Sequence, residues 1–125
     1  MKIKTAELDG VALDWAAAYA LNGKPIFIEA FGLDTLGRSI VNMVGRGFIR
    51  PSREWVQGGP LIEHYRMNLL CESENYWQAD PCVKNGVYLL RYNRQYGKTP
   101  LIAAMRAIAA LELGDYVDAP EELIE

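Results

Sequence analysis

The chain has 125 residues, of which half are hydrophobic and 23% are charged, and this composition indicates one globular domain rather than a disordered chain. The formal net charge of −3 argues against a dedicated binder of duplex DNA, because such proteins depend on neutralising phosphates. The start of the chain lacks the apolar core of a signal peptide, and no apolar run approaches the ~20 residues that cross a bilayer. We therefore expect a soluble, cytoplasmic protein.

A first helix is predicted from Asp9 to about Leu21. An Asp side chain can cap the first turn, and Asn22-Gly23 suits a left-handed exit. We interpret Asp14 as a solvent-exposed acid rather than a catalytic one, since the sequence shows no partner for it. The apolar residues of this helix recur at the spacing of a packed helical face, namely Ala12, Trp15, Ala16 and Tyr19.

Short strands are predicted through the middle of the chain, at residues 25–31, 39–44, 67–71, 76–79 and 87–92. A turn is predicted at 34–38. The stretch from Val87 to Tyr92 is the strongest of these predictions, because it is rich in β-forming residues and follows the turn sequence Asn85-Gly86.

The last helix has clear signals at both ends. Thr99 is a good N-cap, Pro100 is preorganised for the first helical position, and Gly114 ends the run. The acidic tail follows, with Pro120 opening a further turn. Helix, several short strands and helix describe an α+β fold, in which a small, mainly antiparallel sheet carries two principal helices within one domain, residues 1–125.

The stretch from Arg50 to Glu63 is the least generic part of the chain. Prolines restrict its backbone, and the paired Gly58 and Gly59 supply positive φ or a close approach of the backbone. Trp55 either pins this stretch onto the core or belongs to a binding loop. We favour the core, because buried aromatic side chains contribute large packing energies.

A strand followed by Gly97-Lys98-Thr99 and a helix invites comparison with a phosphate-binding loop. That motif needs a glycine where this chain has Tyr92, and Pro100 removes an amide that a phosphate would use, so we do not predict a nucleotide hydrolase. The helix start with Lys98 could still hold a carboxylate or phosphate. A capped helix beside a solvated lysine is the favoured alternative.

We predict no catalytic residue, no metal site and no cofactor. His64 is the single histidine, and no nucleophile can be tied to it by spacing. Cys71 and Cys82 form no C-x-x-C pair, and reduced thiols are expected in the cytoplasm. Recognition by aromatic side chains remains, because ring faces near arginines suit nucleobases or flat ligands, although we expect most of these rings in the core or at its rim: Trp55, Tyr76, Trp77, Tyr92 and Tyr96.

Three blocks of this sequence resemble the NinX family of small phage and prophage proteins, which are usually described as of unknown function. They are Leu8-Asp9-Gly10-Val11-Ala12-Leu13-Asp14-Trp15-Ala16, then Pro51-Ser52 with Trp55 and Gly58-Gly59-Pro60-Leu61-Ile62-Glu63, and Thr99-Pro100-Leu101-Ile102-Ala103-Ala104-Met105-Arg106 with Leu113-Gly114-Asp115. Glu54 stands where the family usually has Asp. The resemblance implies an accessory phage protein made inside a bacterium, and it carries over no catalytic residue.

Two functions follow as hypotheses. The first is a non-catalytic binder that sequesters a small anionic, nucleotide-like ligand, as in counter-defence, with a site formed by Arg53, Trp55, Gly58, Gly59, Lys98 and Thr99. The second is a protein-interaction module that inhibits or redirects a host protein, with Trp55 exposed as an anchor. We expect no membrane or duplex nucleic acid among the partners, and we leave open whether further copies of the chain assemble.

Overall fold

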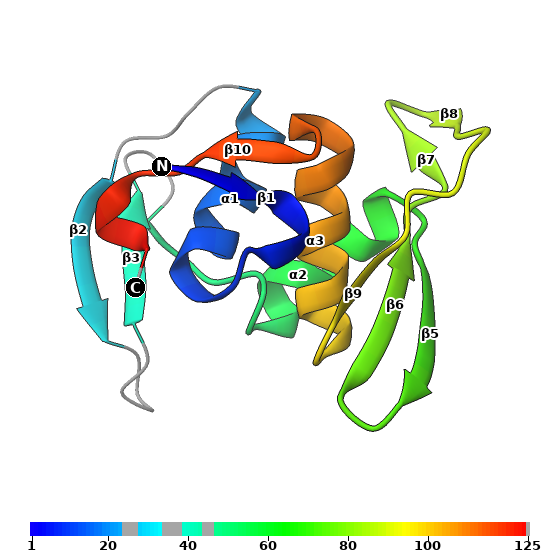
Figure 1. The fold of residues 1–125 in the computed structure, drawn as a ribbon, viewed down its shortest axis with the longest axis horizontal. Helices are drawn as coiled ribbons and strands as arrows, with labels where there is room; N and C mark the ends of the chain where they lie inside the picture. The colour runs from blue at the N-terminus through cyan, green and yellow to red at the C-terminus, as the bar shows by residue number, and fades with distance from the viewer. Residues whose placement is uncertain (24–27, 34–38, 44–46, 125) are drawn as a thin grey trace.

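The computed structural model describes residues 1–23, 28–33, 39–43 and 47–124, and its elements are shown in Figure 1. Three α-helices lie in these ranges: α1 (Gly10–Asn22), α2 (Trp55–His64) and α3 (Pro100–Leu113). Two short 3-10 turns, η1 (Thr5–Glu7) and η2 (Glu121–Leu123), lie near the two ends of the chain. None of the helices in the described ranges is long and apolar enough to span a membrane.

The strands pair antiparallel throughout, which together with the helices confirms the predicted α+β class. Within the described residues they form four small sheets rather than one. Two sheets have three strands, β2-β3-β4 and β5-β6-β9, and two have a single pair, β1-β10 and β7-β8. The strand bounds are β1 Lys2–Lys4, β2 Ile28–Leu33, β3 Ser39–Met43, β4 Gly47–Ile49, β5 Asn68–Ser73, β6 Tyr76–Asp80, β7 Val83–Lys84, β8 Val87–Tyr88, β9 Gln95–Gly97 and β10 Tyr116–Asp118.

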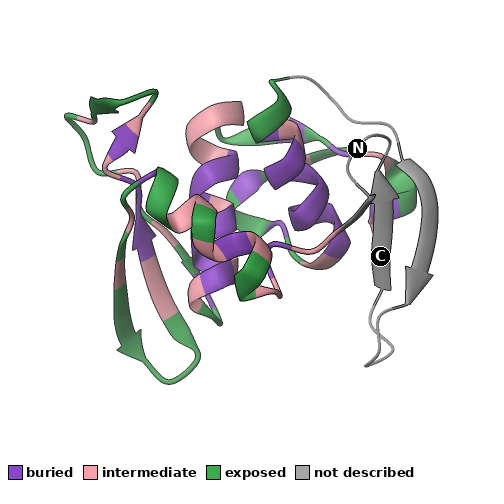
Figure 2. Ribbon diagram, turned by 180° about the vertical axis from the view of Figure 1, so that it is seen from behind, coloured by how far each residue is buried: buried purple, intermediate pink, exposed green. Residues whose placement is uncertain are grey.

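The core lies between α1 and α3, where the buried residues concentrate in Figure 2. Both helices are rich in alanine, and small side chains let two helix axes approach closely. The largest fully buried side chains in this contact include Leu13, Trp15, Met105 and Ile108. Helix α3 also contacts α2, β6 and β9, whereas β3 and β4 contact α1, so the two helices together support the rest of the described chain.

The predicted ends of α1 and α3 are confirmed. Gly23 closes α1 in a left-handed conformation with φ 77°, as the sequence indicated. Asp9 takes the N-cap position of α1, but its side chain makes no capping hydrogen bond. At α3 the Thr99 hydroxyl accepts a hydrogen bond from the backbone N–H of Ile102 at 3.1 Å, and Pro100 follows at the first helical position.

Several predicted strands are present, and the one predicted most strongly is present only in part. Strands β2, β3, β5 and β6 overlap the predicted ranges, whereas the turn predicted at 34–38 lies outside the described residues. The hairpin predicted at Asn85-Gly86 is confirmed, but of the strand predicted from Val87 to Tyr92 only Val87–Tyr88 pairs, with Val83–Lys84. Leu90 is fully exposed (relative accessibility 101%), so the β-forming residues of this stretch meet water rather than a neighbouring sheet.

The stretch around Trp55 is helical rather than a loop, because Gly58, Gly59 and Pro60 lie inside α2. Neither glycine has a positive φ. The other predicted alternative, a close approach of the backbone, is confirmed at Gly58, since a Cβ built on it would clash with the backbone oxygen of Pro51 and would lie 2.6 Å from Cδ2 of Leu101. The contact with Leu101 places the middle of α2 against the first turn of α3.

Candidate functional site

A buried carboxylate on α1 fixes the turn that leads into α2. Asp14 is fully buried, and its Oδ1 accepts a hydrogen bond from the backbone N–H of Ser52 at 2.8 Å. Its Oδ2 accepts one from the Arg53 guanidinium at 3.0 Å. Burial raises the pKa of the Asp14 carboxyl above its ordinary value of 3.8, and the hydrogen bonds from Ser52 and the charge of Arg53 oppose this rise without cancelling it. The expectation of a solvent-exposed Asp14 is therefore wrong.

Further polar contacts lock the same turn from within. The Gln57 side-chain oxygen accepts a hydrogen bond from the backbone N–H of Arg50 at 2.7 Å. The backbone N–H groups of Arg53 and Glu54 both donate to the Arg50 carbonyl at 3.0 Å, and the Arg50 guanidinium pairs with Glu54 at 3.2 Å. The backbone entering α2 is therefore held at both sides of Arg53, which limits the directions in which the first residues of α2 can point.

Those first residues are apolar and exposed. Trp55 is 54% exposed and Val56 is 87% exposed, so the prediction that Trp55 packs into the core is wrong. Pro60, one turn after Val56, is also exposed. A Cβ built on Gly59 would lie 3.9 Å from the Trp55 ring, so the indole lies over the backbone of its own helix. We call Trp55, Val56, Gly59 and Pro60 the α2 face.

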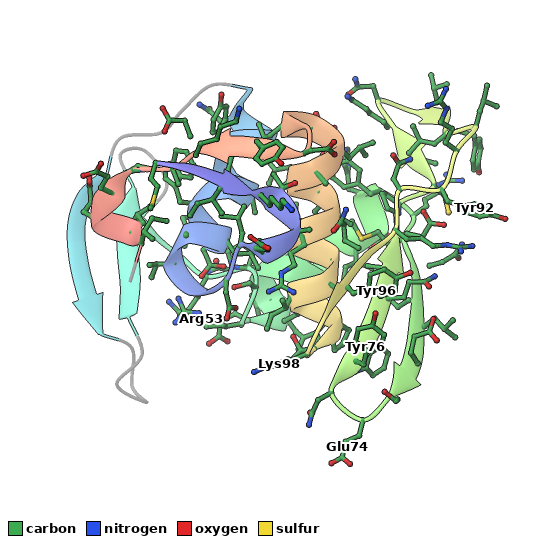
Figure 3. All side chains as sticks on the ribbon, viewed as in Figure 1. Arg53, Glu74, Tyr76, Tyr92, Tyr96 and Lys98 are labelled. Atoms are coloured by element: carbon green, nitrogen blue, oxygen red, sulfur yellow. The ribbon has the colours of Figure 1, made fainter. Side chains whose placement is uncertain are left out.

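The six predicted site residues are only partly brought together. Gly58 and Thr99 lie near each other through Leu101, but the Gly58 amide donates to the Glu54 carbonyl at 2.9 Å and the Thr99 hydroxyl caps α3. Lys98 is exposed beside that cap, whereas Arg53 lies against Asp14 below α1, as the labelled side chains in Figure 3 show. Polar groups that a phosphate would need thus already serve the fold.

A pocket of about 460 Å³ opens at the start of α1, and Arg53 is the one predicted site residue that lines it. Its walls are mainly apolar, from Ile3, Leu8 and Val11, with Leu123 and Ile124 from the other end of the chain. Glu7 and Asp9 also line it. Since two carboxylates face one guanidinium that is already bonded to Asp14, the charges of this pocket do not by themselves favour an anion.

A second exposed surface lies on the three-stranded sheet β5-β6-β9. Leu70, Gln78 and Tyr96 stand opposite one another across the three strands, on the face turned away from α3. Tyr76 shares this face, and its ring stacks on that of Tyr96 with centroids 5.3 Å apart and planes 6° apart. We call Leu70, Tyr76, Gln78 and Tyr96 the tyrosine face.

A buried carboxylate also holds the turn that leads into this sheet. Asp80 accepts a hydrogen bond from the backbone N–H of Asn93 at 3.0 Å, and its other oxygen lies 3.9 Å from Nε of Arg94. The Arg94 side chain stays 42% exposed, and its guanidinium lies 3.9 Å from the centre of the Tyr92 ring. This turn therefore carries a cation–π pair at the surface.

Asp14 and Asp80 were not identified from the sequence as organising residues. For Asp14 a signal existed, because it is the single charged residue in an otherwise apolar and alanine-rich helix, Gly10–Asn22. An isolated acid in such a helix is costly to bury unless a partner elsewhere in the chain meets it. For Asp80, the following proline indicated only a turn. No group of three or more potential metal ligands is present among the described residues.

Comparison with known protein families gives a match over most of the chain. A family model described as Bacteriophage P22, NinX matches residues 4–111, which include α1, α2, the sheet β5-β6-β9 and α3 as far as Leu111. No curated protein matches the chain.

Proposed function

The chain belongs to the phage P22 NinX family, and from this premise we propose that it is a non-catalytic accessory protein that docks onto a protein partner through the α2 face. The observation that carries this proposal is an exposed tryptophan on a helix that polar contacts hold in place. Trp55 is 54% exposed, and the turn before it is bonded to the fully buried Asp14.

Exposed tryptophan beside an exposed aliphatic residue is the composition of an interface anchor. Tryptophan is enriched among the residues that contribute most of the binding free energy in protein interfaces. Trp55 and Val56 together leave a large apolar area in water, and a partner that covers them removes that area from water.

The fixed turn supports the same conclusion energetically. A side chain that is already held in one orientation loses less conformational entropy when it binds. The hydrogen bonds to Asp14 and to Gln57 hold the backbone before Trp55, so the indole is presented in one direction without a partner. In the infected cell such a protein would act by covering or redirecting its partner rather than by chemistry.

A capture experiment tests this proposal. The immobilised chain is incubated with lysate of the bacterial host, and the wild type is compared with Trp55→Ala. We expect at least about a tenfold loss of the captured partner, because anchor residues typically contribute about 2 kcal/mol or more. The unfolding free energy should change by less than about 1 kcal/mol, because the indole is half exposed.

The matched control removes an even more exposed apolar side chain in the segment after β8, Leu90→Ser. This variant should capture the partner as the wild type does. Loss of capture with Leu90→Ser but not with Trp55→Ala would move the docking surface away from α2 and contradict the proposal. Unfolding of Trp55→Ala would show that the indole serves the core.

A second candidate is the binding of a small anionic, nucleotide-like ligand, and the specific observation in its favour is the pocket beside Arg53. Calorimetry with linear and cyclic nucleotides tests it. Heat that disappears with Arg53→Gln while Lys98→Gln leaves it unchanged would place the ligand in this pocket. The absence of heat with every nucleotide would exclude this class of ligand there.

A further inference from the structure

We propose that the tyrosine face binds single-stranded nucleic acid, with the tyrosine rings stacking on unpaired bases and basic side chains along β9 meeting the phosphates. This inference concerns a different surface from the α2 face and does not depend on the protein partner proposed above. It rests on three observations, which are the ring geometry, the local charge and the fixed turn before β9.

The ring geometry suits bases. Tyr76 and Tyr96 stand on neighbouring strands with nearly parallel rings, and both remain exposed, at 46% and 37%. Flat aromatic side chains on the open face of an antiparallel sheet are the usual platform on which proteins stack unpaired bases. Gln78, between the strand partners Leu70 and Tyr96, adds an amide that can donate and accept hydrogen bonds at a base edge.

Basic and acidic residues divide between the two edges of this sheet. From Pro81 to Leu111 there are five basic residues and no acidic one, whereas the exposed Glu72 lies on β5 and the exposed Glu74 in the turn after it. Three of the five basic residues, Arg91, Arg94 and Lys98, are exposed before and after β9, at the opposite edge from β5. Their spacing places positive charge along one edge of the sheet, where a strand of phosphates can follow it.

The turn before β9 extends the aromatic surface. Asp80 holds the backbone of Asn93, and Arg94 lies over Tyr92. Figure 3 shows the labelled Tyr92, Tyr96 and Tyr76 following one another down the same end of the molecule, with Lys98 beyond the end of β9. Since Arg94 covers only one face of the Tyr92 ring, the ring and the guanidinium together offer a further stacking surface.

The ligand is a single strand because paired bases are stacked within their own duplex and cannot lie on the tyrosine rings. An acidic protein surface could bind the same arginines, but its binding would not depend on the parallel tyrosine rings. Substitution of the rings and competition by an anion without bases distinguish these two partners.

The test measures fluorescence anisotropy of a labelled oligothymidylate of about twelve nucleotides, a length within the usual range of single-strand sites. We expect the full-length wild type to bind it with a dissociation constant below about 100 µM at physiological salt. Tyr76→Ala and Tyr96→Ala should each weaken binding by about fivefold to about 100-fold, as expected when one base stack is removed. Tyr96→Phe keeps the ring and should retain the affinity.

The matched control is Tyr116→Ala. Tyr116 is a similarly exposed tyrosine on β10, with the Lys2 ammonium 4.9 Å from its ring centre and Lys4 as its strand partner, but it lies on another sheet, away from the tyrosine face. This variant should bind the oligonucleotide as the wild type does, and so should Trp55→Ala. Lys98→Gln should lower the dependence of log affinity on log salt by about 0.7, the value for one phosphate that is no longer neutralised.

Two results would overturn the proposal. One is the absence of any anisotropy change with the wild type at about 100 µM protein. The other is that the wild type and both tyrosine-to-alanine variants bind the oligonucleotide equally well. It includes the case in which polyphosphate, which has no bases, competes as well as an unlabelled oligonucleotide does. Either form of this second result would mean that charge alone attracts the strand, and an acidic protein surface would then be the better partner for this face.

Discussion

Asp14 and Asp80 hold two different turns in the same way and with different tightness. Each carboxylate accepts a hydrogen bond from one backbone N–H and lies near the arginine that follows that residue in the chain. For Asp14 these are Ser52 and Arg53, and for Asp80 they are Asn93 and Arg94. The Arg53 side chain is 14% exposed and lies 3.0 Å from its carboxylate, whereas Arg94 is 42% exposed and lies 3.9 Å away.

The difference between the two turns separates a structural arginine from an available one. Arg53 is bound to Asp14 so closely that its charge serves the fold, and the surface beside it is apolar. Arg94 keeps a weak contact with Asp80 and lies over Tyr92 at the surface, where its charge can still act on a ligand. The apolar α2 face therefore fits the proposed protein partner, and the tyrosine face, with the available Arg94 before β9, fits the proposed single strand.

Removing the tighter carboxylate should have the largest effect. We expect Asp14→Ala to lower the unfolding free energy by about 3–5 kcal/mol, because it leaves the buried Ser52 amide without its acceptor and removes the ion pair between α1 and Arg53. Urea denaturation measures this loss. The control is Asp118→Ala, which removes an acid that pairs with the N-terminal ammonium in full exposure to water and should leave the urea midpoint almost unchanged. Equal midpoints for the two variants would show that burial of Asp14 has no energetic consequence.

Removing the looser carboxylate should cost less. Asp80→Ala is expected to lower the unfolding free energy by about 1–3 kcal/mol, chiefly because the Asn93 amide would no longer have its acceptor. Urea denaturation of this variant and of Asp14→Ala gives the ratio of the two losses in unfolding free energy. Glu72→Ala, at an exposed position on the neighbouring β5, is the control and should have no effect. A loss as large as that of Asp14→Ala would mean that the two turns are equally fixed.

Adjacent glycines test how closely α2 is held against α3. Gly58→Ala places a Cβ within 2.6 Å of Leu101 and closer still to the Pro51 carbonyl, so we expect a loss of about 1–3 kcal/mol. Gly59→Ala meets only the Trp55 ring at 3.9 Å and should stabilise α2 by up to about 1 kcal/mol, since alanine is the better helix former. Thermal unfolding of the two variants measures whether each substitution lowers or raises the stability. A stabilising Gly58→Ala would contradict the close packing of α2 on α3.

The pH dependence of stability gives the smallest effect. Because burial raises the pKa of Asp14, the folded chain holds this proton more tightly than the unfolded chain. The resulting stabilisation is complete below the ordinary pKa of 3.8 and is lost as the pH rises through the raised pKa. The stability of the wild type relative to Asp14→Asn should therefore fall as the pH increases from about 3 to about 7. A rise over this range would show that the pairing with Arg53 outweighs the burial.

Local signals predicted the two main helices well. Thr99, Pro100 and Gly114 specify the ends of α3 by their own backbone and side-chain chemistry, and Gly23 does so for α1. These residues act within one turn of the helix, so the sequence contains all the information needed. The strands β5 and β6 overlap the ranges predicted at 67–71 and 76–79, whereas their pairing is seen only in the structure.

Features set by distant contacts were not predictable in this way. Gly58 and Gly59 indicate a loop on local grounds, yet they lie in α2, where Gly58 allows the contact with Leu101. Asp14 is buried because it meets Ser52, 38 residues later in the chain. Val87 to Tyr92 has β-forming residues but few strand partners, so most of it remains exposed. The candidate residues Arg53 and Trp55 lie in the stretch that the sequence marks as least generic, but which of them faces solvent depends on these long-range contacts.

One guanidinium on α3 joins the two halves of the molecule. Arg106 donates from Nε to the Leu8 carbonyl at 2.7 Å, just before α1, and from Nη1 to the Tyr96 carbonyl at 2.8 Å on β9. Helix α1, which carries Asp14, and strand β9, which carries Tyr96, are thereby both fixed to α3. A protein held at α2 and a strand held at β9 would keep a constant separation, and binding of one would raise the effective concentration of the other. The chain would then work as a rigid adaptor between them.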